Sequence, residues 1–252
     1  MSEKEIILEL ANAGCFYEKG RPVLEDVSFC VHRGESVGII GANGCGKSTL
    51  FKAVCGLTAH EGEIRVDGMP VDKKNLAGVR RVLGFVMQYS DSQLFMPTVY
   101  DDLAFGLRNR GLSEEEIQAK VDAVLGRLEI IHLKNRQNYK LSGGEKRMIC
   151  LAVILAMGPQ LILLDEPSIT LDPFNRRTLI NRLNEMPETK LIASHDLDMI
   201  LETCGRVILL ENGRIRADGD AQQILSDRTL LESCRLELPF CMQKVMPYRR
   251  KQ

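Results

Sequence analysis

The stretch Gly41-Ala42-Asn43-Gly44-Cys45-Gly46-Lys47-Ser48 decides the fold of this 252-residue chain. It matches GxxxxGK[ST], the pattern of a phosphate-binding loop. The apolar run 37–40 before it predicts a strand, and residues 47–55 predict the helix that follows. Glycines let backbone N–H groups approach phosphate oxygens, and a helix N-terminus adds partial positive charge. This order of strand, loop and helix predicts a nucleotide-binding site.

Two side chains of the loop have predicted roles toward the nucleotide. Lys47 is expected to neutralise the β- and γ-phosphates, and the Ser48 hydroxyl is expected to ligate Mg²⁺. The helix N-terminus and Lys47 also predict a lowered pKa for the Cys45 thiol, and therefore inactivation by thiol reagents that bound nucleotide slows. The predicted nucleotide-binding set from this region is Gly41, Ala42, Asn43, Gly44, Cys45, Gly46, Lys47, Ser48 and Thr49.

Adjacent carboxylates form a second motif. Asp165 and Glu166 follow the apolar run 161–164, which predicts a buried strand. In α/β sheets, ligands bind at the carboxyl ends of the strands, where these two side chains would lie. We expect Asp165 to hold Mg²⁺ through water and Glu166 to act as general base on the attacking water.

The pattern around these motifs predicts an α/β fold. Apolar runs at 6–10, 23–31, 63–66 and 82–87 predict strands, the first ones in an antiparallel β portion beside the strand at 36–40. Residues 100–138 have helical spacing, with a helix start at Ser113. From Lys146 onward, helices alternate with strands at 161–164, 190–194 and 206–210, which predicts a mostly parallel sheet.

Composition excludes several classes of protein. The 33 Lys+Arg and 34 Asp+Glu residues give a net charge of −1, which disfavours a dedicated nucleic-acid binder. Residues 149–164 are the longest apolar passage and are interrupted at 158–160, so no membrane span is expected. The first residues show no secretory signal. Eight scattered cysteines without a CxxC pair predict free thiols in a reducing compartment.

The segment Leu141-Ser142-Gly143-Gly144-Glu145 points to a family. Ser142 and the glycines would begin a helix and present a hydroxyl and bare N–H groups to an anion. The segment resembles the signature of ABC-type ATPases, and the resemblance extends over nearly the whole chain. It implies that Ser142, Gly143, Gly144 and Glu145 bind the γ-phosphate of ATP held by the opposite subunit, so that two chains close head to tail with ATP between them.

Other positions are similar to functional positions of that family. Tyr17 matches the aromatic residue that stacks on adenine, with Phe16 as the competing candidate. Gln88 matches the glutamine that reaches Mg²⁺ and the attacking water. His195 matches the histidine that contacts the γ-phosphate. Residues 168–172 match the loop that crosses the dimer interface, with Ile169 in place of the usual small residue.

The stretch from Gln88 to Gly106 resembles the ATPases of cobalt, nickel and vitamin importers of the energy-coupling-factor type, although Tyr89-Ser90 replaces their usual Asn-Pro. The resemblance implies that this region accepts a coupling helix of an integral membrane subunit. It further implies a peripheral protein at the cytoplasmic face of the cell membrane, which uses ATP and Mg²⁺ and pairs with a second ABC ATPase chain of its own or a related kind.

The fold class is therefore predicted as a P-loop NTPase core with a mostly parallel sheet, an N-terminal antiparallel β subdomain and an inserted α-helical subdomain. We expect one ATPase domain over residues 1–252, with the core at 1–88 and 160–225, the helical subdomain at 89–158 and a C-terminal tail at 226–252. Two alternatives remain: a soluble ABC ATPase acting on nucleic acid or the ribosome, and a non-catalytic module that senses ATP. The single P-loop, the short insertion and the neutral charge disfavour the first, and intact Lys47, Asp165, Glu166 and His195 disfavour the second.

Overall fold

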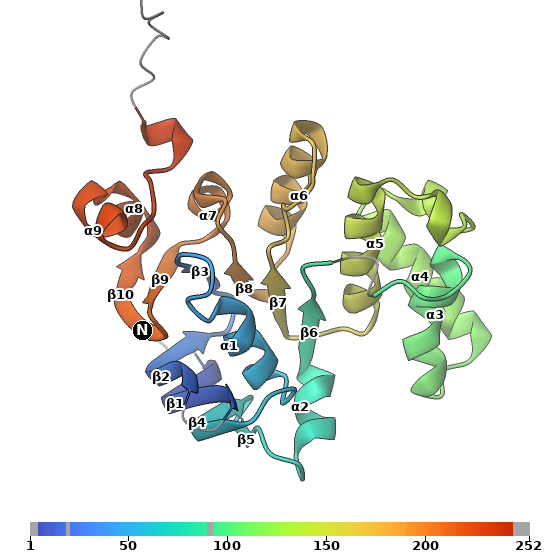
Figure 1. Ribbon diagram of the computed structural model, residues 1–252. Coiled ribbons are helices and arrows are strands. Elements are labelled where there is room, and N and C mark those ends of the chain that lie inside the picture. Colours follow the sequence, from blue (N-terminus) through green and yellow to red (C-terminus); the bar gives the residue numbers. More distant parts are fainter. Residues whose placement is uncertain (1–4, 19–20, 90–92, 244–252) are drawn as a thin grey trace, which may run out of the picture.

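A six-stranded sheet forms the centre of the protein, for which the computed structural model describes residues 5–18, 21–89 and 93–243, without the side chains of residues 17, 18 and 21 (Figure 1). The strand order is β10-β9-β3-β8-β7-β6, and all neighbours are parallel except β10 with β9. The strands are β3 (Ser36–Ile40), β6 (Leu83–Val86), β7 (Leu161–Asp165), β8 (Thr189–Ala193), β9 (Arg206–Glu211) and β10 (Arg214–Asp220).

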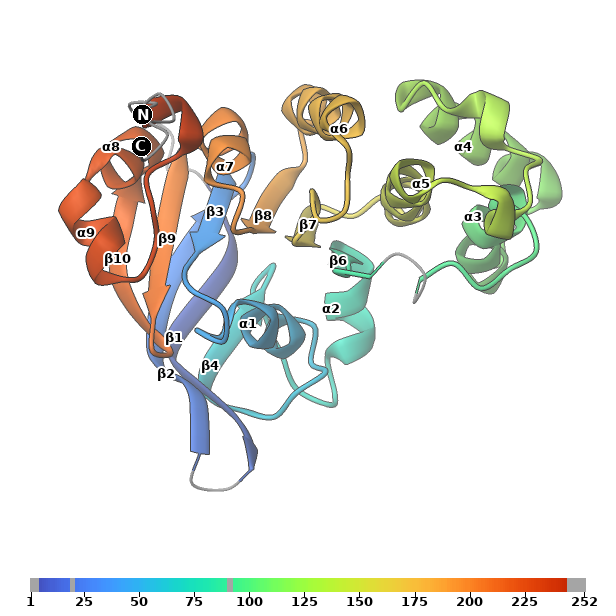
Figure 2. The ribbon, with the colours of Figure 1, turned by 45° about the horizontal axis from the view of Figure 1, so that its top comes forward.

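A second, antiparallel sheet in the order β2-β1-β4-β5 covers one face of the structure. Its strands are β1 (Ile6–Glu18), β2 (Arg21–His32), β4 (His60–Val66) and β5 (Met69–Pro70). Helix α1 (Lys47–Val54) packs beside this sheet and follows β3 and its loop, as Figure 2 shows. The N-terminal residues thus form the expected antiparallel β subdomain.

The remaining helices fall into two groups. Three of them, α3 (Val99–Asn109), α4 (Glu114–Arg127) and α5 (Gly143–Ala156), form the green to olive-yellow group at one side of Figure 1, with single 3₁₀ turns at Ile131–Leu133 and Asn138–Lys140. The others are α2 (Leu76–Val82), α6 (Pro173–Glu185), α7 (Leu197–Thr203), α8 (Ala221–Ser226) and α9 (Arg228–Ser233), followed by a 3₁₀ turn at Phe240–Met242. Within the described residues, no helix combines the length and the apolar character that a membrane span requires.

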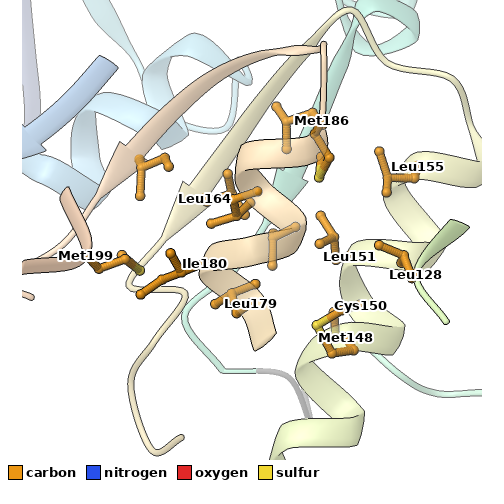
Figure 3. Packing of buried hydrophobic residues seen from close by; sticks show 14 of the residues in the cluster. Leu128, Met148, Cys150, Leu151, Leu155, Leu164, Leu179, Ile180, Met186 and Met199 are labelled. Carbon is orange, nitrogen blue, oxygen red and sulfur yellow. The ribbon is translucent and has the colours of Figure 1, made fainter. Parts of the chain in front are cut away.

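The central sheet divides two hydrophobic cores. Because successive side chains of a strand point to opposite faces, Ile162 and Leu164 of β7 belong to one core while Leu161 and Leu163 belong to the other. The first core joins the sheet to α3–α9, and Figure 3 shows residues from it, among them Leu151 of α5. The second core joins the sheet to α1 and the antiparallel strands. Burial on both faces explains why these strands are continuous apolar runs.

The predicted fold class is confirmed, and the differences are local. The strand expected at 82–87 is shorter, because Val82 still belongs to α2 and β6 ends at Val86. The sequence pattern did not predict α2, β5, β10, α8 or α9. These are elements of at most seven residues, for which a hydrophobic period is too short to read.

Candidate nucleotide site

Glycines shape the loop between β3 and α1. Gly41 has φ +149, and a Cβ there would lie 2.3 Å from the carbonyl oxygen of Leu210. Gly46 has φ +111 at the N-cap of α1, and a Cβ there would lie 2.4 Å from the side chain of Leu24. Both positions therefore require glycine for conformational and for steric reasons. Gly46 offers no side-chain cap, so the first N–H groups of α1 are available to an anion.

Lys47 lies inside this loop and is only 7% exposed. Its Nζ donates to the carbonyl of Gly41 at 2.7 Å and to that of Ala42 at 3.4 Å. These two hydrogen bonds hold the ammonium group against the main chain of the phosphate-binding loop. The neighbouring Cys45 thiol is also buried.

The prediction of a lowered pKa for Cys45 is wrong. Burial raises the pKa of the thiol, and this desolvation outweighs the opposing influence of the Lys47 charge and of the backbone N–H groups. The sequence showed the cation and the helix end but could not show how far the thiol is removed from water.

The surroundings of the Asp165 carboxylate indicate whether the site fits a metal ion. The side chain, at the end of β7, is 4% exposed, and its Oδ1 has no hydrogen-bond partner among the described residues. Burial raises the pKa of this carboxyl group, while a hydrogen bond with Ser48 lowers it. A buried carboxylate with an unsatisfied oxygen beside a hydroxyl is the kind of oxygen donor set that Mg²⁺ takes. The residues present therefore fit Mg²⁺ at the predicted position.

Glu166 and His195 contact each other. The Oε2 atom of Glu166 lies 2.7 Å from Nδ1 of His195 and accepts a hydrogen bond from the His195 backbone N–H at 3.2 Å. The Ser194 hydroxyl donates to the same oxygen at 3.3 Å. Glu166 is 6% exposed and has φ +47, an uncommon value for a residue with a Cβ. Its N–H donates to the carbonyl of Ala193, which ties the end of β7 to β8.

Two adjoining cavities bring the predicted residues together. They have volumes of about 390 and 340 Å³ and share Asn43, Gln88 and Glu166 in their linings. The first is further lined by Val23, Gly44, Gly46, Lys47, Ser48 and Thr49. The second is further lined by Gly41, Ala42, Ile169, His195, Arg235 and Leu236. The phosphate-binding loop, Gln88, Glu166 and His195 thus surround one continuous region.

The signature segment lies elsewhere on the chain. Ser142 is the N-cap of α5: its hydroxyl accepts from the N–H of Glu145 at 3.3 Å, and its own N–H donates to the Glu145 carboxylate at 2.7 Å. Ser142 and Gly143 are exposed, whereas Gly144 is buried against Asn175, whose side chain leaves no space for a Cβ. The described residues that line the two cavities do not include any of these signature positions.

Of the two adenine-stacking candidates, only Phe16 has a described side chain. Tyr17 belongs to β1, but its side chain lies outside the described part of the structure. Phe16 lines a separate cavity of about 370 Å³ together with Pro22 and Glu61. In the loop at 168–172, Ser168 is buried, and the N–H of Ile169 donates to the carbonyl of Glu166 at 3.2 Å.

Three residues near the site were not predicted from the sequence. Arg235 and Leu236 come from the segment after α9, which was expected only as a tail, and they line the cavity beside His195. Arg147 of α5 is buried and reaches the backbone at Gln88 and Glu166. A buried arginine is rare, and only its place in an otherwise apolar helix face hinted at this role.

Comparisons with known proteins show the family of this chain. Residues 24–169 match the family described as ABC transporter. The chain belongs to the ABC transporter ATPase family. An ABC transporter ATP-binding protein of Geobacter sulfurreducens is 44% identical over 238 residues, which cover 94% of this chain and 96% of that protein. The energy-coupling factor transporter ATP-binding protein EcfA of Methanothermobacter thermautotrophicus is 40% identical over 92% of this chain and 77% of its own length.

Among solved structures, cbiO1 from Clostridium perfringens, part of the ABC transporter complex cbiONQ, superimposes with a TM-score of 0.83. It is 33% identical to this ABC ATPase, over 95% of this chain and 98% of the other. The protein is thus an ATP-binding subunit of an ABC transporter, and it couples ATP hydrolysis to transport.

One surface of this ABC ATPase carries exposed aromatic side chains. Phe95 and Tyr139 are 66% and 75% exposed and line one cavity, and Phe95 packs edge to face on the partly exposed Phe105 with ring centroids 5.1 Å apart. Tyr89, which comes soon after β6, is 67% exposed. The buried Asp102 carboxylate accepts from the N–H groups of residues 95 and 96 and thereby fixes this loop. Such a cluster of exposed apolar residues is typical of a contact surface for another protein.

Proposed function

We propose that this protein is the ATP-hydrolysing subunit of an importer of the energy-coupling-factor type, and that it works as a dimer with two MgATP between the chains. The observation that supports this best is the division of the site within one chain. Lys47, Gln88, Glu166 and His195 surround the cavities at the phosphate-binding loop. Ser142 and Gly143 are exposed and line neither cavity, so they are free to meet a nucleotide bound to another chain.

The proposed roles follow from the contacts. Lys47 and the N–H groups at the start of α1 bind the phosphates. Glu166 takes a proton from the attacking water, and its hydrogen bond with His195 orients the carboxylate. Gln88 positions this water from its place in the shared cavity lining. Ser48 and Asp165 would hold Mg²⁺, which neutralises developing phosphate charge when it is bound.

The membrane partner is proposed to bind at the region from Gln88 to Gly106. The exposed Tyr89, Phe95 and Phe105 support an apolar contact with a helix of an integral membrane subunit at the cytoplasmic face of the membrane. Gln88 lies at one end of this region and in the site, so movement of the partner would reach the water-binding part of the cavity directly.

The proposed cargo is a small metal ion, cobalt or nickel, or a vitamin. This proposal rests on the likeness to cbiO1 and to the energy-coupling factor ATP-binding proteins. The side chains of this subunit would not contact the cargo, so they do not indicate which cargo is carried. Uptake of radioactive cobalt, nickel and vitamins by cells that express the chain with its membrane partners measures this. Accumulation of none of them contradicts the cargo assignment.

Replacing the general base tests the catalytic proposal. Glu166→Gln is expected to lower phosphate release about 100-fold or more, because general-base catalysis contributes about 10²–10⁴-fold. Binding of MgATP should remain, and light scattering should detect a dimer that accumulates with ATP. The matched control is Glu115→Gln, which removes an exposed carboxylate of α4 and should leave turnover unchanged. Turnover of Glu166→Gln within tenfold of the original protein would contradict the general-base role.

Binding of the membrane partner is tested at the aromatic surface. Phe95→Glu should abolish co-purification of the membrane subunit from detergent extract while ATP binding stays unchanged. Leu57→Glu is the control, because Leu57 is similarly exposed, at 58%, but follows α1 at a different part of the protein. Equal loss of the partner from both variants would contradict a specific contact at Phe95.

A further inference from the structure

Arg147 is a buried cation on the signature helix. Its residue exposure is 3%, although arginine side chains seldom leave water completely. Nη1 donates to the carbonyl of Met87 at 2.7 Å, and Nη2 donates to the carbonyls of Gln88 and, at 3.4 Å, of Glu166. All three of these acceptors are main-chain carbonyl oxygens. One side chain of α5 therefore holds three carbonyl groups that belong to two other segments.

These carbonyls lie where two neighbouring strands end. Met87 and Gln88 follow β6, Glu166 follows β7, and β6 pairs in parallel with β7. The rigid planar fork of a guanidinium can contact several acceptors only if they are held at fixed relative positions. The contact thus fixes the main chain of Gln88 relative to that of Glu166.

Burial of Arg147 is costly, and the cost is partly offset in the site. Desolvation lowers the pKa of the guanidinium, while the nearby Cys150 and Asp165 favour its charged form. A methionine at this position would pack in the same apolar helix without a buried charge. The presence of a buried arginine here therefore points to a role beyond packing.

The main chain that Arg147 contacts is held in a defined conformation at Glu166 and near Gln88. Glu166 has φ +47, a conformation that costs free energy and that its surroundings must maintain. The segment before Gln88 is held from a second side, since Gln93 accepts from the N–H of Met87 and donates to the carbonyl of Phe85, both at 2.8 Å. Arg147 supplies the contact between these two strand ends and α5, the helix that begins at the signature serine.

We infer that Arg147 is a positioning residue, which sets Gln88 and Glu166 in register with each other and with the signature helix. The inference rests on the proposed roles of Gln88 and Glu166 in hydrolysis. It implies that turnover depends on Arg147 while binding of MgATP at the phosphate-binding loop does not. A role in folding alone would instead lower thermal stability and leave the turnover of each folded molecule unchanged.

Three variants test this. In Arg147→Met, kcat for phosphate release should fall about 100-fold, because a displacement of about 1 Å in a catalytic group has that effect. KM and the Kd for MgATP should stay within about threefold, since the phosphate contacts are elsewhere. Arg147→Lys keeps the charge and the fold but cannot span three carbonyls, so an intermediate kcat with an unchanged melting temperature is expected. The matched control is Arg110→Met, because Arg110 also donates to a main-chain carbonyl, that of Met157 at 2.7 Å, but is exposed.

A double variant measures whether Arg147 acts through Gln88. If it does, Gln88→Ala combined with Arg147→Met should lower kcat by much less than the product of the two separate effects. Multiplicative effects, or kcat within twofold of the original in both Arg147→Met and Arg147→Lys, overturn the inference. These outcomes differ from failure of the proposed function, in which Glu166→Gln itself retains turnover.

Discussion

Two helices of this protein begin at glycine-containing segments, and they begin differently. Helix α1 starts after Gly46, which provides no side-chain cap, and Lys47 at its first position is buried. Helix α5 starts after Ser142, and a reciprocal capping box with Glu145 already satisfies the hydroxyl and the N–H of Ser142. Both helix ends favour an anion. Of the two, the N-terminus of α1 is the one that lines a cavity of its own chain in which an anion could bind.

The difference indicates how the two ends are used. The end of α1 lies in a cavity with Gln88 and Glu166, so phosphate bound there meets the proposed catalytic groups at once. The end of α5 lies on the surface, where Ser142 and Gly143 are exposed and the capping box satisfies the first turn of the helix. Variants at the two ends should therefore separate binding of ATP from its hydrolysis.

A charge at the exposed end should have the largest effect. Gly143→Asp places a carboxylate where the proposed dimer holds the γ-phosphate, so we expect turnover to fall about 100-fold or more through repulsion and loss of donors. The substituted side chain has space, because a Cβ at Gly143 would meet nothing within 4 Å. Phosphate release, dimer formation with ATP and melting temperature are the measurements.

The control for this variant is Gly126→Asp. Gly126 lies in α4, and a Cβ there would likewise meet nothing within 4 Å, but no role is proposed for this residue. Gly126→Asp should therefore keep normal turnover. If both aspartates reduced hydrolysis equally, the surface position of Gly143 would have no special role.

Removal of the charge at the buried end should instead weaken binding. Lys47→Ala is expected to raise the Kd for MgATP about 10- to 100-fold, because a hydrogen bond to a charged group contributes about 1.5–3 kcal/mol. Titration with a fluorescent ATP analogue measures this. Lys52→Ala, further along α1 and exposed, serves as a comparison. An unchanged Kd in Lys47→Ala would show that the two helix ends do not differ in the proposed way.

The two capping boxes at α4 and α5 allow a smaller and sharper comparison. Ser113 at α4 and Ser142 at α5 are capped alike, by Glu116 and Glu145. Ser113→Ala and Ser142→Ala should each lower the free energy of unfolding by about 1 kcal/mol, as loss of an N-cap does. Only Ser142→Ala should also lower turnover, by about tenfold or more, because its hydroxyl is the one proposed to reach ATP. Equal turnover in the two variants would limit Ser142 to a helix cap.

The phosphate-binding loop and the strand ends at Asp165 and Glu166 could be predicted from the sequence because each is a contiguous motif. A short stretch of chain fixes the local geometry, and the alternation of strands and helices places both at the same edge of a parallel sheet. Contacts such as that of Arg147 with Gln88 join residues 59 positions apart. No local pattern encodes them, since they depend on how α5 packs against the sheet.

Cys45 shows the same limit in its chemistry. The sequence shows a thiol just before a helix N-terminus and two residues before a lysine, and both lower a thiol pKa. Burial has the opposite effect and prevails. Residue neighbours along the chain can thus predict which charges act on a group, whereas the degree of desolvation requires the packed fold.

The raised pKa of Cys45, just before α1, predicts how its reactivity depends on pH. A thiol with a lowered pKa is already ionised near pH 7, so its alkylation rate would level off there. Because the pKa of Cys45 is raised, its thiolate fraction should be small at about pH 7, and the rate should keep rising through about pH 9. Mass spectrometry of protein treated with N-ethylmaleimide measures the rate at this residue, with Cys45→Ser identifying the peptide. MgATP should slow the reaction further, because nucleotide in the loop covers the thiol. An alkylation rate that stays constant between about pH 7 and about pH 9 would contradict this prediction. It would mean that the helix N-terminus and Lys47 lower the pKa of Cys45 by more than burial raises it, so that the uncapped end of α1 has a stronger electrostatic effect than the buried position of the thiol.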